Sequence, residues 1–180
     1  QMQTSSTCPK CSAKGKIITK KPMDADENGM IREETLTEIE IPAGVSEGMQ
    51  LKIPNEGNEA PFEGVNGDLL VLIEEEKHEE LIRDGINIHY DLYINISEAI
   101  LGTKKQIPTI EGKVEINIPP GIQNGKILRL QSKGIPDINE YSRERGDLLV
   151  HVNVWTPKNI NINQKKFFED NKNAEEFTRP

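Results

Sequence analysis

Cys8 and Cys11 are the residues whose types and spacing come closest to a recognisable chemistry. Two thiolates separated by two residues can face one metal ion from a single tight turn, as zinc ligand pairs do. A structural zinc ion needs four ligands, and the chain has no other cysteine. Half of a zinc site is therefore the first interpretation. An idle dithiol and a redox pair are the alternatives, although a redox motif needs a βαβ context that the flanking sequence lacks.

The other residue types that serve in catalysis are scattered along the chain. His78, His89 and His151 have no serine, cysteine or carboxylate at a catalytic spacing, and alternation with apolar neighbours predicts solvated strand faces for the last two. The acidic run at 74–76 lacks the pattern of a calcium loop and is typical of a solvated strand edge. No glycine-rich phosphate loop is present, so we expect neither a bound nucleotide nor an enzyme.

Composition narrows the class of protein further. The 180 residues carry 30 acidic and 22 basic side chains, a net charge of −8, which argues against a nucleic-acid-binding surface. The longest apolar runs, such as 69–73, are far shorter than the ~20 residues that span a bilayer, so we expect no membrane partner. Residues 1–20 lack the apolar core of a signal peptide, and the chain has no cysteine besides Cys8 and Cys11. These features favour a cytoplasmic protein.

Alternation of apolar and polar residues predicts a mainly β fold. Turns rich in glycine, proline and asparagine separate the alternating segments. Two helices are predicted, one capped by Ser97 and closed by Gly102, and one over 164–170 after Asn163. The predicted strands are 36–41, 49–53, 69–73, 86–96, 114–118, 127–130 and 150–154.

An internal repeat organises these elements. Residues 41–53 match 118–130 at an offset of 77, and residues 67–71 match 146–150 at an offset of 79. We therefore expect two tandem β-sandwich-like subdomains, with one short helix in the second and a helical segment at the C-terminal end. The paired glycines suit turns with positive φ, and the aspartates that follow Gly67 and Gly146 suit the capping of a tight turn.

A series of motifs, taken in order, resembles the C-terminal half of the DnaJ co-chaperones, the zinc-containing type of J-domain protein. The resemblance implies two substrate-binding β subdomains, a zinc region inserted into the first, and a C-terminal dimerisation segment. It also implies that the protein holds unfolded polypeptides and delivers them to the ATP-driven chaperone DnaK. The motifs are at 8–15, 41–48, 67–71, 81–85, 99–102, 107–112, 133–136 and 146–149.

The resemblance divides the chain into four expected segments and has clear departures. The family has four Cys-x-x-Cys-x-Gly-x-Gly copies; this chain has one, with Ala13 at the first glycine, so zinc is expected only in an intact parent protein. There is no His-Pro-Asp triplet, so the sequence resembles a fragment. The expected segments are a zinc-region remnant at 1–33, a first subdomain without its upstream strands at 34–84, a second subdomain at 85–157 and a dimerisation segment at 158–180.

The family's client groove lies on the first β subdomain, which points to the predicted strands 36–41 and 69–73. Ordinary core packing is the alternative role for these residues. Phe167 and Phe168 are candidates for a homodimer contact, with packing on the second subdomain as the alternative. A structural or assembly module that binds one specific folded partner is the alternative function class. The candidate client-binding residues are Leu36, Ile39, Ile41, Leu69, Val71 and Ile73.

Overall fold

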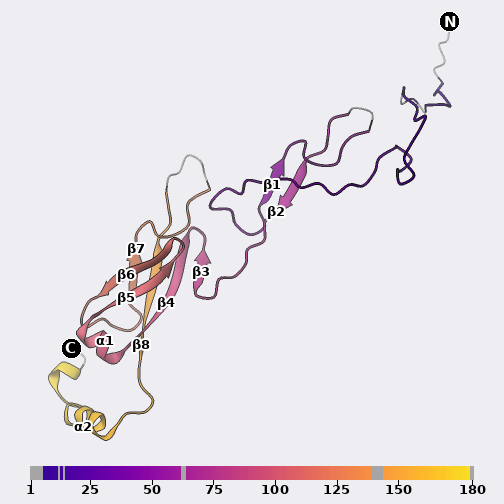
Figure 1. The fold of residues 1–180 in the computed structure, drawn as a ribbon. Coiled ribbons are helices and arrows are strands. Elements are labelled where there is room, and N and C mark those ends of the chain that lie inside the picture. The colour runs from indigo at the N-terminus through magenta and orange to yellow at the C-terminus, as the bar shows by residue number, and fades with distance from the viewer. Residues whose placement is uncertain (1–5, 12, 14, 62–63, 139–143, 179–180) are drawn as a thin grey trace. The chain divides into compact units, whose positions relative to one another are not determined.

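The computed structural model describes residues 6–11, 13, 15–61, 64–138 and 144–178. The chain forms two compact units, residues 1–75 and 76–180, and its secondary structure is mainly β, as predicted (Figure 1). Residues 81–84, which the sequence grouped with the first subdomain, form a strand that pairs inside the second unit. Among the described residues, no helix is both long enough and apolar enough to cross a membrane.

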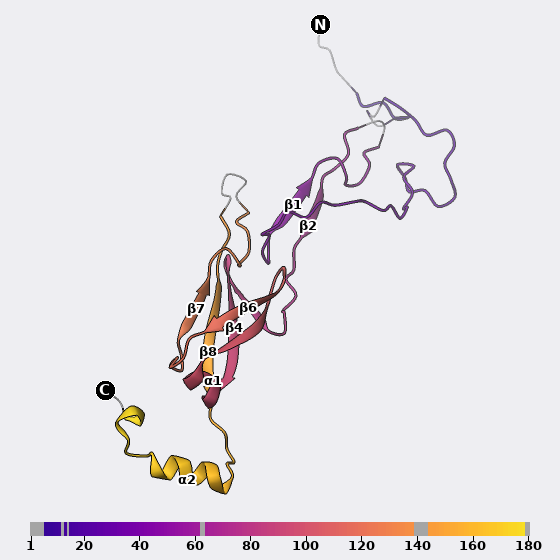
Figure 2. The same ribbon diagram turned by 60° about the vertical axis from the view of Figure 1, so that its left-hand side comes forward.

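The first unit is built around a two-stranded antiparallel hairpin of β1 (Gln50–Ile53) and β2 (Leu69–Leu72), which run side by side in Figure 2. Leu51 lies opposite Val71, and Ile53 lies opposite Leu69. Because alternate residues of a strand point to opposite faces, these four side chains share one face. All four are half-buried, and no described residue of this unit is fully buried.

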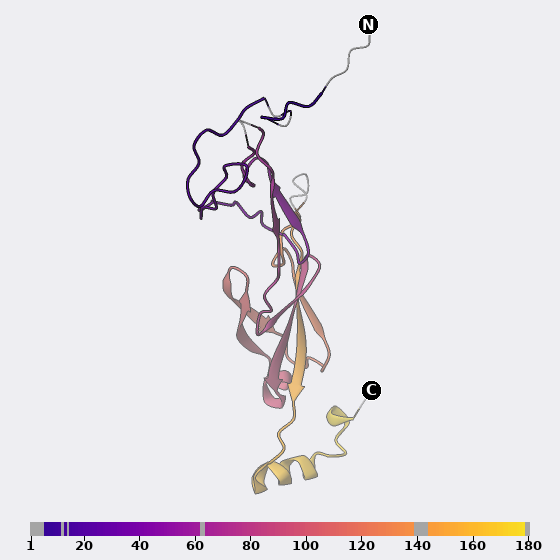
Figure 3. The same ribbon diagram turned by 90° about the vertical axis from the view of Figure 1, so that its right-hand side faces the viewer.

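The second unit has a four-stranded sheet in the order β3-β4-β8-β7. The central pair, β4 and β8, is parallel, whereas the two outer pairs are antiparallel. A hairpin of β5 and β6 lies on one side of this sheet, as Figure 3 shows. The strands are β3 (Leu81–Asp84), β4 (Asn87–Asn95), β5 (Thr103–Thr109), β6 (Gly112–Ile118), β7 (Ile127–Leu130) and β8 (Leu148–Trp155).

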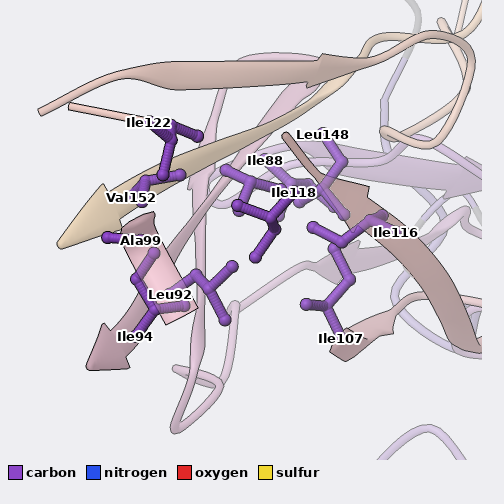
Figure 4. Packing of buried hydrophobic residues seen from close by; sticks show 11 residues of the cluster. Ile88, Leu92, Ile94, Ala99, Ile107, Ile116, Ile118, Ile122, Leu148 and Val152 are labelled. Atoms are coloured by element: carbon purple, nitrogen blue, oxygen red, sulfur yellow. The ribbon is translucent and has the colours of Figure 1, made fainter. Parts of the chain in front are cut away.

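The buried core of the described chain lies entirely in the second unit. Alternate residues of β4 and β8 meet alternate residues of the β5–β6 hairpin, so the period-two pattern places one apolar side chain in every second position inside (Figure 4). Burying a side chain of this size contributes about 1.5–3 kcal/mol. The buried residues are Ile88, Leu92, Ile94, Ala99, Ile107, Ile116, Ile118, Ile122, Leu148, Val150 and Val152.

The helices begin earlier than predicted. Asn95, not Ser97, caps α1 (Ile96–Leu101): its Oδ1 accepts from the Glu98 backbone N–H at 2.9 Å, and Glu98 Oε2 accepts from the Asn95 N–H at 3.0 Å. Asn161 caps α2 (Ile162–Asp170) in the same way through Gln164. A polar residue caps each helix, as predicted, and in both helices it is the residue that completes a capping box. A short 3-10 helix, Glu175–Phe177, follows.

The two copies of the sequence repeat make equivalent backbone hydrogen bonds. The glycines predicted to need positive φ have it, at 93° and 79° for Gly44 and Gly48 and at 76° and 79° for Gly121 and Gly125. Three N–H to C=O hydrogen bonds of the first copy each have an equivalent in the second copy. Gly48 to Ile73 (3.0 Å) corresponds to Gly125 to Val152 (2.9 Å), and Ile73 to Met49 (2.9 Å) corresponds to Val152 to Lys126 (2.9 Å). Gly57 to Gly67 (2.8 Å) corresponds to Gly134 to Gly146 (2.8 Å).

Asp68 and Asp147 have the structural role that the sequence predicted. Each carboxylate accepts a hydrogen bond from a backbone N–H in the facing turn and pairs with a cation on the neighbouring strand, which lowers its pKa. The Lys52 contact is the main cause for Asp68, and the Ser132 N–H is the main cause for Asp147. The partners are Asn55 N (3.2 Å) and Lys52 Nζ (2.6 Å) for Asp68, and Ser132 N (2.9 Å) and Arg129 Nη2 (2.5 Å) for Asp147.

The predicted strand at 36–41 is wrong for this structure. Its repeat equivalent is β6, which pairs with β5, whereas the described part of the first unit offers residues 36–41 no partner strand. Ile41 is 60% exposed, and its equivalent Ile118 is 1% exposed. Alternation marks residues that can form a strand, but a strand exists only where another strand satisfies its backbone groups.

Gly146 gives a matched test of how tightly the second unit packs. A Cβ at Gly146 would overlap the backbone carbonyl of Ile86, whereas a Cβ at the equivalent Gly67 meets nothing closer than 3.8 Å. We expect Gly146→Ala to lower the free energy of unfolding of the second unit by about 2–3 kcal/mol, and Gly67→Ala to have little effect. Amide hydrogen exchange of β4 and β8 measures the difference. Equal protection in the two variants would contradict the close packing.

Candidate functional site

A groove of about 370 Å³ lies beside β1 in the first unit. Four consecutive residues of β1 line it, and because consecutive side chains point to opposite faces, the groove must follow the edge of the strand. Its apolar lining is flanked by two glutamates and one lysine. The lining residues are Glu38, Ile39, Glu40 and Pro42 from the segment before β1, and Gln50, Leu51, Lys52 and Ile53 from β1.

The structure brings together some of the sequence-predicted client-binding residues. Ile39 lines the groove, and Leu69 and Val71 share the hairpin face of its β1 lining. Ile73 continues the hairpin beyond β2, because its C=O accepts from the Gly48 N–H and its N–H donates to the Met49 C=O. Leu36 is 96% exposed and lies outside the groove lining.

Two groove residues, Leu51 and Ile53, were missed as site residues by the sequence analysis. Both belong to the predicted strand at 49–53, and both face the nominated residues of β2 in the register Leu51 to Val71 and Ile53 to Leu69. The sequence feature that could have pointed to Leu51 and Ile53 was the alternation of apolar and polar residues along β1. It could not be used without knowing which strand β2 pairs with, which is a tertiary fact.

The internal repeat allows each candidate client-binding residue to be compared with the equivalent residue of the second unit. Five of the six occupy positions whose equivalents are buried core residues of the second unit, whereas none of the five is buried in the first unit. The sixth, Leu36, is equivalent to Lys113, which is exposed. The equivalent pairs are Ile39 and Ile116, Ile41 and Ile118, Leu69 and Leu148, Val71 and Val150, and Ile73 and Val152.

The difference follows from which strands are present. In the second unit β4 pairs with the far edge of β8, and the β5–β6 hairpin and α1 complete the core. The described residues of the first unit contain β1 and β2 alone. In the described residues no further strand covers the half-buried apolar face of this hairpin, and the groove follows the edge of β1. In general, an extended chain segment can pair with a strand edge through its backbone without any reactive side chain.

Cys8 is exposed, and Cys11 is partly so. Hydrogen bonds from the backbone N–H groups of Cys11 and Lys10 lower the pKa of the Cys8 thiol. Among the described residues, no third cysteine, histidine or carboxylate joins them in a group that could hold a metal ion. Two thiols do not make the four-ligand set that a zinc ion needs, so the described residues alone do not fit a complete zinc site.

The aromatic residues near the C-terminal end form a cluster of their own. Phe167 meets Phe168 edge to face with ring centroids 5.6 Å apart, and it meets Phe177 at 6.4 Å. Phe167 is 53% exposed and Phe177 is 49% exposed, and no residue of α2 is buried. The sequence analysis missed Phe177, which reaches the cluster through the turn after α2. This aromatic cluster is defined as Phe167, Phe168 and Phe177.

The lowered pKa of Cys8 predicts early formation of its thiolate. Because the folded turn supplies the amide hydrogen bonds, Cys8 should be alkylated by iodoacetamide at a lower pH in the native, metal-free, reduced chain than in urea, where a thiol has its ordinary pKa of about 8.5. Peptide mass spectrometry at a series of pH values measures the rate. Superimposable pH profiles in the two conditions would contradict the hydrogen-bonded turn.

Comparison with known proteins agrees with this architecture. The model of the DnaJ C terminal domain family matches residues 10–157. The chain is 43% identical over 199 aligned residues to Chaperone protein DnaJ of Bacteroides thetaiotaomicron. That alignment covers 96% of this chain and 50% of the relative. The chain is 44% identical over 176 residues to Chaperone protein DnaJ of Porphyromonas gingivalis (98% and 45%) and 38% identical over 179 residues to that of Chlamydia felis (97% and 45%).

The chain thus spans about half the length of these curated relatives, which are named as chaperones, a non-enzymatic kind of protein. The family model covers both halves of the internal repeat and the turns that they share. The resemblance found in the sequence is confirmed. The chain belongs to the DnaJ C-terminal domain family and corresponds to the C-terminal half of a DnaJ chaperone.

Proposed function

We propose that this chain holds unfolded or partly folded polypeptides and, in the intact protein, delivers them to an ATP-dependent DnaK-type chaperone. The observation that carries the proposal is the groove of about 370 Å³ that follows the edge of β1 in the first unit. Ile39, Leu51 and Ile53 line the groove, and Leu69 and Val71 share the hairpin face of Leu51 and Ile53. An accessible apolar face beside a strand edge suits an extended client segment.

The groove supports binding that tolerates many sequences. A client strand along the edge of β1 would bond through its backbone, which every sequence has, and its alternate apolar side chains would contact Ile39, Leu51 and Ile53. Each such side chain contributes about 1.5–3 kcal/mol when fully buried. Ordering each client residue costs about 1–2 kcal/mol. The two terms nearly offset, so one groove should bind weakly and release readily. The proposed client-binding residues are Ile39, Ile41, Leu69, Val71 and Ile73 from the sequence, together with Leu51 and Ile53 from the groove; Leu36 lies outside the groove lining.

Weak binding favours a paired arrangement. In this proposal Phe167 and Phe168 join two copies of the chain into a homodimer, so one long client can contact two grooves. The second contact then becomes intramolecular, which raises overall affinity without any new groove residue. The exposed aromatic cluster and the absence of buried residues on α2 support this role.

Cys8 and Cys11 enter the proposal as two thiolate ligands of a zinc ion in the intact protein, which acts in the cytoplasm. Zinc would fix the local turn by holding both thiolates. Client holding uses the apolar side chains and the strand edge, so no step of it passes through the metal or through a bound nucleotide.

Two neighbouring residues on β2 test the groove. Val71 shares the face of Leu51, whereas Leu70 is exposed on the opposite face. A charge at Val71 should oppose burial of a client side chain, so Val71→Asp should weaken suppression of aggregation of chemically denatured proteins about tenfold in the concentration required, and Leu70→Asp should not. Hydrogen exchange of the paired backbone amides of β1 and β2 serves as the folding control, because both variants lie in that hairpin.

Several unrelated denatured proteins should be used as clients. Suppression of all of them by the wild-type chain separates a holding function from an assembly module, which would bind one folded partner and suppress none. Unchanged suppression of aggregation by Val71→Asp, or an equal loss in Val71→Asp and Leu70→Asp, would contradict the assignment of client binding to the face of Val71.

The dimer proposal has its own test. The double variant Phe167→Ala, Phe168→Ala removes two rings of the aromatic cluster and should give a species of 20.2 kDa in light scattering, where the wild-type chain gives about twice that mass. Ile162→Ala is the control, because Ile162 is exposed on the same helix but lies outside the cluster. Persistence of a dimer in the double variant would count against these residues.

A further inference from the structure

The groove along β1 carries an unbalanced set of charges. Its ionisable lining residues are Glu38, Glu40 and Lys52, and all three are exposed. Among the residues that the structure describes, no basic side chain forms an ion pair with Glu38 or Glu40. Two carboxylates therefore stand beside the apolar lining of the groove without a counter-charge from the described chain.

Lys52 is already paired inside the hairpin. Its Nζ lies 2.6 Å from Oδ2 of Asp68, just before β2, and this contact is the main cause of the lowered pKa of the Asp68 carboxyl group. The second unit has the equivalent pair, Arg129 Nη2 with Asp147 Oδ2 at 2.5 Å, so the contact belongs to the repeated hairpin. With Lys52 neutralised by Asp68, the two glutamates give the groove a net negative charge.

The second unit shows what the equivalent positions do when a strand lies beside them. Glu38 is equivalent to Glu115 on β6, whose Oε1 lies 3.0 Å from Nζ of Lys104 on β5. Glu40 is equivalent to Asn117, which is opposite Lys104 in the register of β5 with β6. The paired strand thus supplies a cation to the glutamate. In the groove, the position of the neutral amide holds a second carboxylate.

Pairing of polar side chains across strands recurs in the second unit. Nδ1 of His89 on β4 lies 2.8 Å from Nε2 of His151 on β8, and the amide of Asn153 donates to Oδ1 of Asp91 at 3.2 Å between the same strands. The expectation of two solvated histidines is therefore wrong, because both are half-buried and in contact. Where a neighbouring strand is present in this fold, polar side chains find partners on it.

The sequence around the groove adds to its negative charge. Residues 33–75 contain 11 acidic side chains and one basic side chain, Lys52. The other basic residues of the first unit all precede Glu33. Charges of one sign that gather on a surface raise the local concentration of oppositely charged partners and speed their association. The first unit should therefore attract basic chain segments and repel acidic ones.

We propose that the groove selects apolar client segments that are flanked by lysine or arginine, and that Glu38 and Glu40 receive the basic side chains. The inference rests on the proposed client holding and adds the class of client to it. The apolar side chains of the segment contact Ile39, Leu51 and Ile53, and its basic flanks contact the two carboxylates. A segment with acidic flanks meets repulsion from the same carboxylates, so the selection also works by exclusion.

Fluorescence anisotropy of three labelled peptides with the full chain tests the selection. The peptides share one alternating apolar core and differ only in their flanks, which are lysine, serine or glutamate. Exposed ion pairs each contribute little, so two of them should make the lysine-flanked peptide bind about three- to tenfold more tightly than the serine-flanked one. The glutamate-flanked peptide should bind most weakly. An increase in NaCl from about 50 mM to about 500 mM should remove most of these differences, because salt screens exposed charges.

Two double variants locate the selection. Glu38→Gln with Glu40→Gln removes both groove carboxylates and should make the lysine-flanked and serine-flanked peptides bind equally. Glu33→Gln with Glu34→Gln is the matched control, because it removes the same charge from exposed residues outside the groove lining, and it should keep the preference for lysine. Hydrogen exchange of the paired amides of β1 and β2 checks the hairpin in both double variants.

The outcomes separate this inference from the holding proposal. Equal binding of the three peptides by the wild-type chain would overturn the charge selection and leave client holding in place. An equal loss of the lysine preference in the two double variants would also overturn it, because the overall charge of the unit would then set the preference. Failure of all three peptides to bind would overturn client holding by the groove, and the selection with it.

Discussion

The parallel pairing of β4 with β8 is the interaction on which the second unit depends. It places Ile88, Leu92 and Ile94 beside the alternate apolar residues of β8, and the β5–β6 hairpin closes over both. The partners are far apart in the sequence, so this contact must offset the entropy of closing a long loop. The burial that it makes possible accounts for every fully buried residue of the described chain.

The described hairpin of the first unit repeats the local features of the second unit. Its hairpin has the same glycine turns, the same aspartate that accepts from the facing turn, and the same backbone hydrogen bonds as the second unit. These are local interactions and need only the hairpin itself. The core positions are different, because they are buried only when further strands cover them. In the described residues the second unit therefore has a closed core, whereas the first unit has the hairpin and the groove along β1, for which holding of extended chains is proposed.

The charged and polar groups follow the same division between local and long-range contacts. Asp68 and Asp147 serve equivalent turns and owe their lowered pKa values to neighbours in the same hairpin. The pair of His89 and His151 has no counterpart in the first unit, since the contact exists only where β4 lies beside β8. The two units thus differ in chemistry for the reason that they differ in burial.

The sequence by itself determined the β class, the repeat, the positive-φ glycines and the bounds of β7, because turn chemistry and alternation are local properties. Family membership also followed from the ordered motifs. Only the tertiary structure decided that residues 36–41 lack a partner strand, that Leu51 and Ile53 line the groove, and that Phe177 joins Phe167. It alone decided that His89 and His151 lie in contact. Each of these depends on which distant segments meet, and a strand pattern states what a segment can pair with but not whether the partner is there.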